Sequence, residues 1–118
     1  MGTVAGLVRS LYERYQARDW TAAALLLHPD VRLQMPATAE TLNGRDAVIG
    51  MQERYPEPWG DLTVLRVVAD ADAAVAEVEI VAEADTFRCA AFWRARDAQL
   101  MEGVEYWVTL GGDEPGPR

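Results

Sequence analysis

Four stretches in the second half of the chain decide the fold, because apolar and polar residues alternate in each: LTVLRVVA (62–69), AAVAEVEIVAEA (73–84), TFRCAAFWRAR (86–96) and QLMEGVEYWVTL (99–110). A period of two is typical of β-strands with one buried face. Short turns at residues 70–72 and 97–98 separate neighbouring stretches, and strands joined by tight turns pair antiparallel. The sequence therefore predicts a meander of four antiparallel strands.

The residues before this meander have the spacing of helices. Apolar side chains recur every three or four positions from Val4 to Tyr15 and predict a first helix over about residues 3–17. Asp19 is a suitable N-cap for a second helix, from Trp20 to Leu27. Two helices are therefore expected before the first strand.

The next segment predicts one short strand and a third helix. Residues 31–35 alternate as a strand that Pro36 ends, and residues 37–42 are expected to form a loop. The run Asn43-Gly44-Arg45-Asp46 resembles a capping box with Asn43 as the cap. We expect the helix that follows to place Val48, Met51 and Tyr55 on one face.

This order of elements predicts the α+β class, with helices on one face of a curved antiparallel sheet. The concave interior of such a sheet is where a small ligand would bind. We expect residues 1–110 to form a single domain and residues 111–118, rich in Gly, Pro and acid, to form a flexible tail.

Composition narrows the class of protein. The chain has 118 residues, of which 50% are hydrophobic and 25% charged, as expected for one globular domain. It carries 11 basic and 19 acidic residues, a net charge of −8, which argues against nucleic acid or an anionic membrane as partner. The single cysteine, Cys89, cannot form an intramolecular disulfide, so we expect a cytoplasmic protein. No sequence motif for a nucleotide, flavin or metal is present, so no cofactor is expected.

Four short stretches follow one another in a characteristic order. They are Leu11-Tyr12 to Asp19-Trp20, His28-Pro29-Asp30-Val31, Asn43-Gly44-Arg45-Asp46 and Glu105-Tyr106-Trp107. With this spacing the chain resembles the SnoaL-like branch of the nuclear transport factor 2-like (NTF2-like) superfamily over about residues 4–110. The resemblance implies a cone-shaped, cystatin-like α+β barrel, in which the sheet wraps around the N-terminal helices and a small-molecule pocket. It also implies a homodimer.

The superfamily includes several chemistries, and the ketosteroid isomerases are the first to compare. The resemblance to them runs without gaps from Asp19 to Pro36. It places their general base at Met35, their oxyanion-hole tyrosine at Leu11 and their oxyanion-hole acid near Ala91. All three residues are apolar here, and a methionine cannot accept a proton. The isomerase mechanism is therefore not expected.

This sequence meets the residue requirements of two other enzyme classes of the superfamily to different degrees. Epoxide hydrolases resembling limonene-epoxide hydrolase use two acids and an arginine. Glu105 would supply one acid, and Arg88 or Arg94 would supply the cation. The second acid is missing from this sequence. Polyketide cyclases fold a flexible substrate in an apolar cavity and need one acid/base group. This sequence meets the requirement of the cyclases most easily.

Glu105 is the predicted acid/base group. The alternation of residues 99–110 places Glu105 and Trp107 on one face, and the resemblance directs this face into the interior. Near Trp93, Trp107 and Met35, a carboxyl group would have a raised pKa because desolvation disfavours its charged form. That suits proton transfer near neutral pH. The alternative is an ion pair with an arginine such as Arg88.

The predicted pocket surrounds Glu105 and has an aromatic wall suited to a planar or polycyclic ligand. Gln52 would either orient a carbonyl group or face solvent, and Cys89 would be an inert buried thiol. Ordinary core packing is the alternative for each aromatic residue. The predicted pocket residues are Tyr15, Met35, Gln52, Tyr55, Cys89, Trp93 and Trp107.

On the outer face of the sheet we expect an acidic stripe, Glu77, Glu79, Glu83 and Asp85, to pair with Arg88, Arg94 and Arg96.

From Glu105 and the predicted pocket, the chain is predicted to be a cofactor-independent cyclase, dehydratase or isomerase of a small apolar carbonyl compound. A non-catalytic binding module or a dimerisation module of the same fold are the alternatives.

Overall fold

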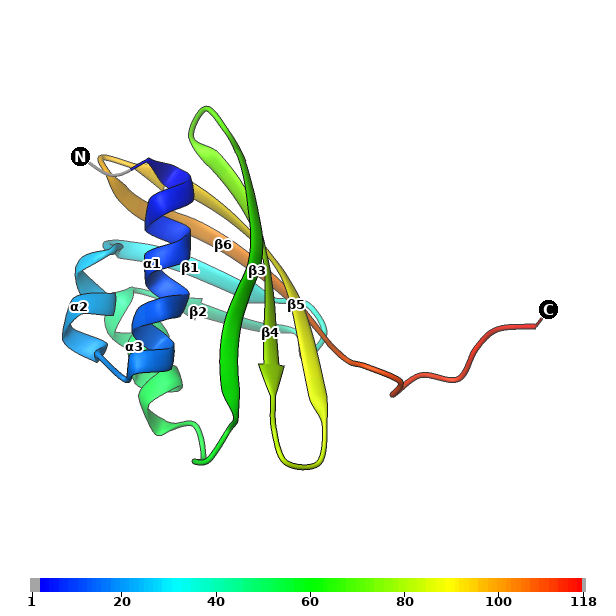
Figure 1. The fold of residues 1–118 in the computed structure, drawn as a ribbon. Helices are drawn as coiled ribbons and strands as arrows, with labels where there is room; N and C mark the ends of the chain where they lie inside the picture. Colours follow the sequence, from blue (N-terminus) through cyan, green and yellow to red (C-terminus); the bar gives the residue numbers. More distant parts are fainter. Residues whose placement is uncertain (1–2, 118) are drawn as a thin grey trace.

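Three helices and six strands make up the computed structural model, which describes residues 3–117 (Figure 1). The helices and strands, in chain order, are α1 (Val4–Ala17), α2 (Trp20–Leu25), β1 (Leu27–Met35), β2 (Glu40–Asn43), α3 (Arg45–Arg54), β3 (Asp61–Asp70), β4 (Ala73–Val81), β5 (Thr86–Arg96) and β6 (Gln99–Thr109). The predicted α+β class is confirmed.

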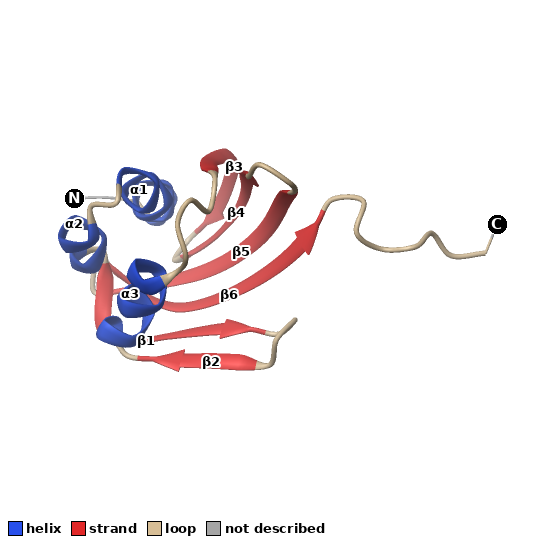
Figure 2. Cartoon of the chain, turned by 90° about the horizontal axis from the view of Figure 1, so that it is seen from below, coloured by secondary structure: helices blue, strands red, loops and turns tan. Residues whose placement is uncertain are grey.

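All six strands form one sheet in the order β2-β1-β6-β5-β4-β3. The predicted meander is confirmed, because β3, β4, β5 and β6 pair antiparallel with their neighbours in the chain. The sheet differs from a wholly antiparallel one at β1, which pairs parallel with β6. Figure 2 shows that the sheet curves without closing and that the helices lie on its concave side.

Helix α1 fills the hollow of the sheet. Its inward stripe, Val4, Val8, Leu11, Tyr12 and Tyr15, is buried, as its spacing predicts. The facing side chains come from alternate positions of the strands, among them Val31, Leu33, Ala76, Val78, Cys89, Ala91 and Trp93. The core therefore lies between α1 and the central strands.

Of the two predicted helix caps, Asp19 is confirmed and Asn43 is wrong. The Asp19 carboxylate accepts a hydrogen bond from the Ala22 amide and caps α2. The cap of α3 is Gly44 rather than Asn43, and no side chain caps that helix. Asn43 is instead the last residue of β2, where it pairs with Arg32 of β1.

The region between α2 and α3 contains the main errors of the sequence prediction. Helix α2 ends at Leu25, and β1 starts at Leu27 rather than Val31, because the Leu100 amide donates to the Leu26 carbonyl oxygen and starts the pairing with β6. The predicted loop 37–42 contains the edge strand β2, which pairs with the last residues of β1.

The outer face of the sheet carries ion pairs in part as predicted. Arg88 pairs with Glu79 at 2.6 Å and with Glu77 at 3.5 Å, and Glu77 also pairs with Arg66. Arg94 and Arg96 do not join this stripe; they pair with turn residues Asp72 and Asp97. The prediction failed for these two because of the register: Arg94 lies opposite Ala73, next to the turn residue Asp72, and Arg96 lies beyond the paired residues of β4.

After β6, residues 110–117 contain no helix or strand. Figure 1 shows this segment leaving the body of the molecule, and its flexibility stays a prediction. Within the described residues, no helix is long and apolar enough to cross a membrane.

Candidate functional site

One cavity, of about 420 Å³, lies between the helices and the sheet. Residues of α1, α3, the loop after α3 and all six strands form its wall. The aromatic lining residues are Tyr12, Tyr15, Tyr55, Trp59, Phe87 and Trp107, and the others are Met35, Ala37, Thr38, Glu40, Met51, Gln52, Leu62, Ile80, Glu105, Val108 and Thr109. The lining is thus largely apolar, with few polar groups, as is usual for small-molecule pockets.

Glu105 is the buried acid of this cavity, with only 1% of its surface exposed. The alternation of β6 puts it inward with Gly103, whereas Tyr106 and Val108 are about half exposed on the other face. Among residues 3–117, Glu105 is the sole charged or polar residue in the buried class. The sequence predicted that the Glu105 side chain points into the interior, and the structure agrees.

Three aromatic side chains hold the Glu105 carboxyl group. The Tyr12 hydroxyl donates to Oε2 at 2.5 Å, and Trp107 Nε1 donates to Oε1 at 3.1 Å. Trp93 Nε1 in turn donates to the Tyr12 hydroxyl oxygen at 3.0 Å. Both carboxyl oxygens therefore accept a hydrogen bond from a neutral donor, as an ionised carboxylate requires.

Local structure explains why these groups meet. In α1, Tyr12 and Tyr15 are three residues apart and lie on the same face, edge to face at 5.7 Å. In the sheet, Trp93 and Gly103 are direct partners on β5 and β6. The absence of a side chain at Gly103 leaves room for the Trp93 ring, which turns its N–H toward Tyr12.

Burial controls the protonation of this cluster. Desolvation raises the pKa of Glu105, and the hydrogen bonds from Tyr12 and Trp107 partly oppose this by stabilising the carboxylate. The pKa values of Tyr12 and Tyr15 are raised well above the usual value for tyrosine by burial and by the negative charge of Glu105. Both tyrosines therefore stay protonated, which leaves Glu105 as the candidate for proton exchange in this cluster.

Six of the eight predicted site residues line the cavity with Glu105 at its centre: Tyr15, Met35, Gln52, Tyr55, Glu105 and Trp107. Tyr55 is 56% exposed and lies at the rim. Gln52 is half-buried in the wall.

Cys89 and Trp93 are buried but do not line the cavity. They point inward as predicted, but α1 covers this part of the sheet, so Trp93 contacts Tyr12 instead of the open space. Burial and the nearby charge of Glu105 raise the pKa of the Cys89 thiol, which makes it unreactive. Nor does Glu105 pair with Arg88, which lies on the outer face with Glu79.

Tyr12 and Trp59 are the most informative of the lining residues that the sequence prediction missed. Tyr12 belongs to the helical stripe of α1, and the stripe alone did not distinguish a core tyrosine from a partner of Glu105. Trp59 is not among the predicted pocket residues. It is 9% exposed and lines the cavity, and the Arg18 guanidinium lies 3.7 Å from its ring centroid. Its Nε1 atom is buried without a hydrogen-bond partner in the described part of the chain.

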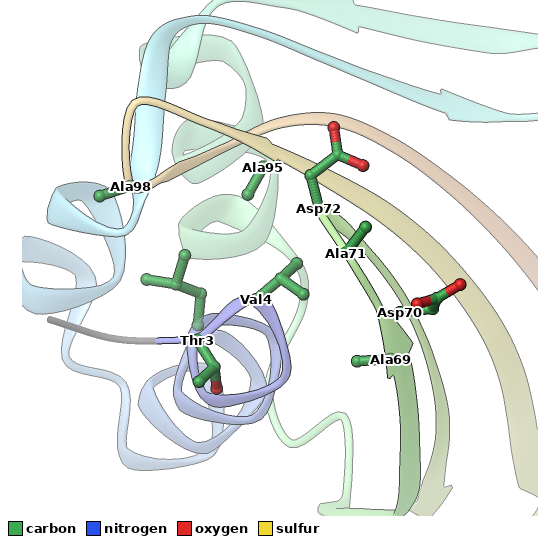
Figure 3. Close-up of a pocket in the computed structure, with 9 residues that line it drawn as sticks. Thr3, Val4, Ala69, Asp70, Ala71, Asp72, Ala95 and Ala98 are labelled. Atoms are coloured by element: carbon green, nitrogen blue, oxygen red, sulfur yellow. The ribbon is translucent and has the colours of Figure 1, made fainter.

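A second hollow, of about 380 Å³, lies near the N-terminal end of α1 (Figure 3). Its wall includes Thr3, Val4 and the β3–β4 turn, and its carboxylates are the exposed Asp70 and Asp72. Asp72 already pairs with Arg94. No buried polar group lines this hollow, so the Glu105 cavity is the better candidate site.

Solved structures share the fold of this chain. A provisionally assigned ketosteroid isomerase from Kribbella flavida is 28% identical, with a TM-score of 0.90, and the match covers 98% of this chain and 83% of that chain. A protein with a ketosteroid isomerase-like fold from Catenulispora acidiphila, in complex with trimethylamine, is 16% identical (TM-score 0.72; coverage 85% and 83%). An epoxide hydrolase from M. tuberculosis resembling limonene-epoxide hydrolase is 14% identical (TM-score 0.75; coverage 89% and 82%).

No curated protein matches the sequence. The family of SnoaL-like domains matches residues 8–103, a span that includes α2, α3 and the first five strands. Together with the NTF2-like neighbours, this match confirms the resemblance found in the sequence. The chain belongs to the SnoaL-like domain family.

Proposed function

We propose that this protein binds a small, largely apolar carbonyl compound in the Glu105 cavity and converts it by acid–base chemistry without a cofactor. Cyclisation, dehydration and isomerisation are the reactions that fit. The observation that carries the proposal is Glu105, a buried carboxyl group at the wall of an aromatic cavity. A carboxyl group with a raised pKa is suited to take up and return a proton near neutral pH.

The contacts of Glu105 support both halves of a proton-transfer cycle. As a carboxylate, it is stabilised by Tyr12 and Trp107 and can accept a proton from a carbon next to a carbonyl group. As an acid, it can return that proton to another atom of the same ligand. The Gln52 side chain lines the same cavity and is placed to hydrogen-bond a carbonyl oxygen.

Similar solved structures add support at the level of the fold. Two of them are named for an isomerase and an epoxide hydrolase, which favours an enzymatic role on a small molecule. The protein that holds trimethylamine favours a small organic ligand.

The test uses 2-tetralone, an apolar bicyclic ketone whose α-protons exchange with D₂O under base catalysis. NMR would follow this exchange with the wild type, Glu105→Gln and Glu102→Gln. Glu102 lies on the same strand but is exposed on the outer face, so its variant is the matched control. We expect the wild type and Glu102→Gln to accelerate exchange equally. The exchange rate with Glu105→Gln should be at least 100-fold lower, in line with the usual contribution of general acid–base catalysis.

A non-catalytic binding module is the alternative, because no second acidic group lies beside Glu105 and the other carboxylate of the cavity, Glu40, is exposed at its edge. Saturable binding of 2-tetralone without accelerated exchange would favour that alternative. Exchange that is equal in the wild type and Glu105→Gln would refute the assignment of Glu105.

We also propose that the protein is a homodimer that buries the outer face of the sheet. Phe92 and Tyr106 are 46% and 47% exposed there, and their rings pack edge to face at 5.9 Å. An exposed cluster of this kind is typical of an interaction surface. Light scattering after size exclusion should give a dimer for the wild type and a monomer for Phe92→Glu. A wild-type monomer would refute the proposal.

The cytoplasmic location is likewise a proposal. It is supported by the single cysteine, Cys89, which is free and buried. The division into one domain over residues 1–110 and a flexible tail is proposed from the same reading of the sequence, and the lack of helix or strand after Thr109 supports it.

A further inference from the structure

The charges that line the Glu105 cavity all have one sign. Of the lining residues, Glu105 and Glu40 carry a charge, and no arginine or histidine is among them. The chain has no lysine. Arginines that form ion pairs do so elsewhere, with Glu57, Glu77 and Glu79 or with turn aspartates. An anionic ligand would therefore enter this cavity without a compensating charge.

Glu105 itself lacks a cationic partner. Its two oxygens accept hydrogen bonds from the Tyr12 hydroxyl and the Trp107 indole, which are both neutral. Within residues 3–117, no basic side chain lies within ion-pair distance of it. A carboxylate that is 1% exposed and unpaired is destabilised, and either a proton or a cation relieves this. The protein supplies no such cation, so a ligand can supply it.

The aromatic wall is suited to a cation as well. Rings of Tyr12, Tyr15, Tyr55 and Trp107 line the same space as Glu105. The negative face of an aromatic ring attracts ammonium groups, and several rings around one point add their effects. Trp59 already makes this contact with Arg18, whose guanidinium lies 3.7 Å from the ring centroid. Of the remaining rings, Tyr55 is the most exposed and Trp107 is half-buried.

We propose that the ligand of this cavity is an organic cation, a protonated amine on an apolar body, whose ammonium group pairs with Glu105. This inference rests on the proposed function: the carbonyl compound proposed above would also carry a protonated amine, so that one molecule in the same cavity holds both groups. An apolar body fits the lining side chains Met35, Met51, Leu62 and Ile80. The acidic character of the whole chain, with a net charge of −8, adds a field that attracts cations.

Binding of a cation should then be linked to a proton. Glu105 faces Tyr12 and Tyr15 from α1, Cys89 and Trp93 from β5, and Trp107 on its own strand. The pKa values of the tyrosines and of Cys89 are raised, so these groups stay neutral. Because the pKa of Glu105 is raised, an ammonium ligand displaces the carboxyl proton to solvent at any pH below that pKa. Affinity should rise with pH, by up to about tenfold per unit, until the pKa of Glu105 in the empty protein is passed.

Three probes with the same ring and different charges test the proposal by calorimetry at pH 7. They are N,N-dimethylcyclohexylamine, a cation; cyclohexyl methyl ketone, which is neutral; and cyclohexanecarboxylate, an anion. We expect the amine to bind at least tenfold more tightly than the ketone, and the carboxylate not to bind. Glu105→Gln should lower the affinity for the amine at least tenfold and change the affinity for the ketone by no more than about threefold. Glu102→Gln should change neither affinity.

The outcomes separate this inference from the proposed function. If the ketone binds as tightly as the amine, or the amine keeps its advantage in Glu105→Gln, the cation proposal is wrong and the carbonyl-binding cavity stands. If none of the probes binds, both proposals fail. If Glu105→Gln does not fold, the pH dependence of the two affinities in the wild type tests the cation proposal. The amine should gain affinity between pH 5 and 8 and the ketone should not, and equal behaviour would overturn the proposal.

Discussion

Gly103 controls the geometry of the candidate site, and its replacement by alanine gives the sharpest test of the structure. A Cβ atom at this position would lie 2.6 Å from Cη2 and Cζ3 of Trp93. Real Cβ atoms essentially never approach other atoms this closely, so the Trp93 ring must move. Because Trp93 is 2% exposed, its movement disturbs the core and separates its Nε1 from the Tyr12 hydroxyl.

The size of this effect follows from two contributions. Overpacking of a filled core costs about 1–3 kcal/mol, and the lost hydrogen bond adds about 1 kcal/mol. We therefore expect Gly103→Ala to lower the free energy of unfolding by about 2–4 kcal/mol and the Tm by about 10 °C. Gly103 does not have a positive φ angle, so backbone strain does not contribute.

A double-mutant cycle measures the clash directly in denaturant unfolding. Trp93→Phe removes the outer part of the ring and is destabilising by itself, by about 1–3 kcal/mol. In the double variant the added methyl group has room, so the combined loss should be smaller than the sum of the single losses by at least 1 kcal/mol. Losses that add within 0.5 kcal/mol would show that Gly103 and Trp93 do not compete for the same space, and the reasoning would be refuted.

Two further predictions concern the ionisation of Glu105. Tyr12→Phe removes a donor to the carboxylate, so the pKa of Glu105, followed by carbon NMR of the side chain, should rise further; an unchanged or lower value would contradict the contact. Because the pKa of Glu105 in the folded protein is raised above that of the unfolded chain, its contribution to stability is fully present below the unfolded pKa and is lost as the pH rises through the folded pKa. Glu105→Gln should therefore gain stability relative to the wild type as the pH rises above 4.5, the ordinary pKa of glutamate, by at most about 1.4 kcal/mol per pH unit, and a flat difference would disagree.

The strands of the meander could be predicted because each one carries its own signal. The alternation in residues 73–84 and 86–96 gives both the strand and its buried face without reference to the rest of the chain. Strand β2 has no such signal, because three of its four residues are exposed and one is half-buried. Strand β2 is defined by its antiparallel pairing with β1. The four residues of β2 do not carry a pattern of their own that would indicate this pairing.

The same limit explains which part of the site was predicted. Glu105 was found because its direction follows from alternation along one strand. Tyr12 could be placed on the inward face of α1, but contact with Glu105 depends on how α1 packs across the sheet, 93 positions away in the chain. Cys89 and Trp93 were assigned to the pocket for the same reason, since alternation tells which face is inward but not which part of that face the helix covers.

The energetics of Glu105 argue that its role is chemical rather than structural. A buried carboxyl group is costly, and apolar residues of similar volume often stabilise a core by more. The partners of Glu105 are large aromatic residues that would pack in this core without it, and its carboxyl group supplies the acceptors for the Tyr12 hydroxyl and the Trp107 N–H. The structure thus holds the carboxyl group with two neutral donors at the wall of a cavity. Stability alone gives no reason for this arrangement, whereas binding or proton transfer does.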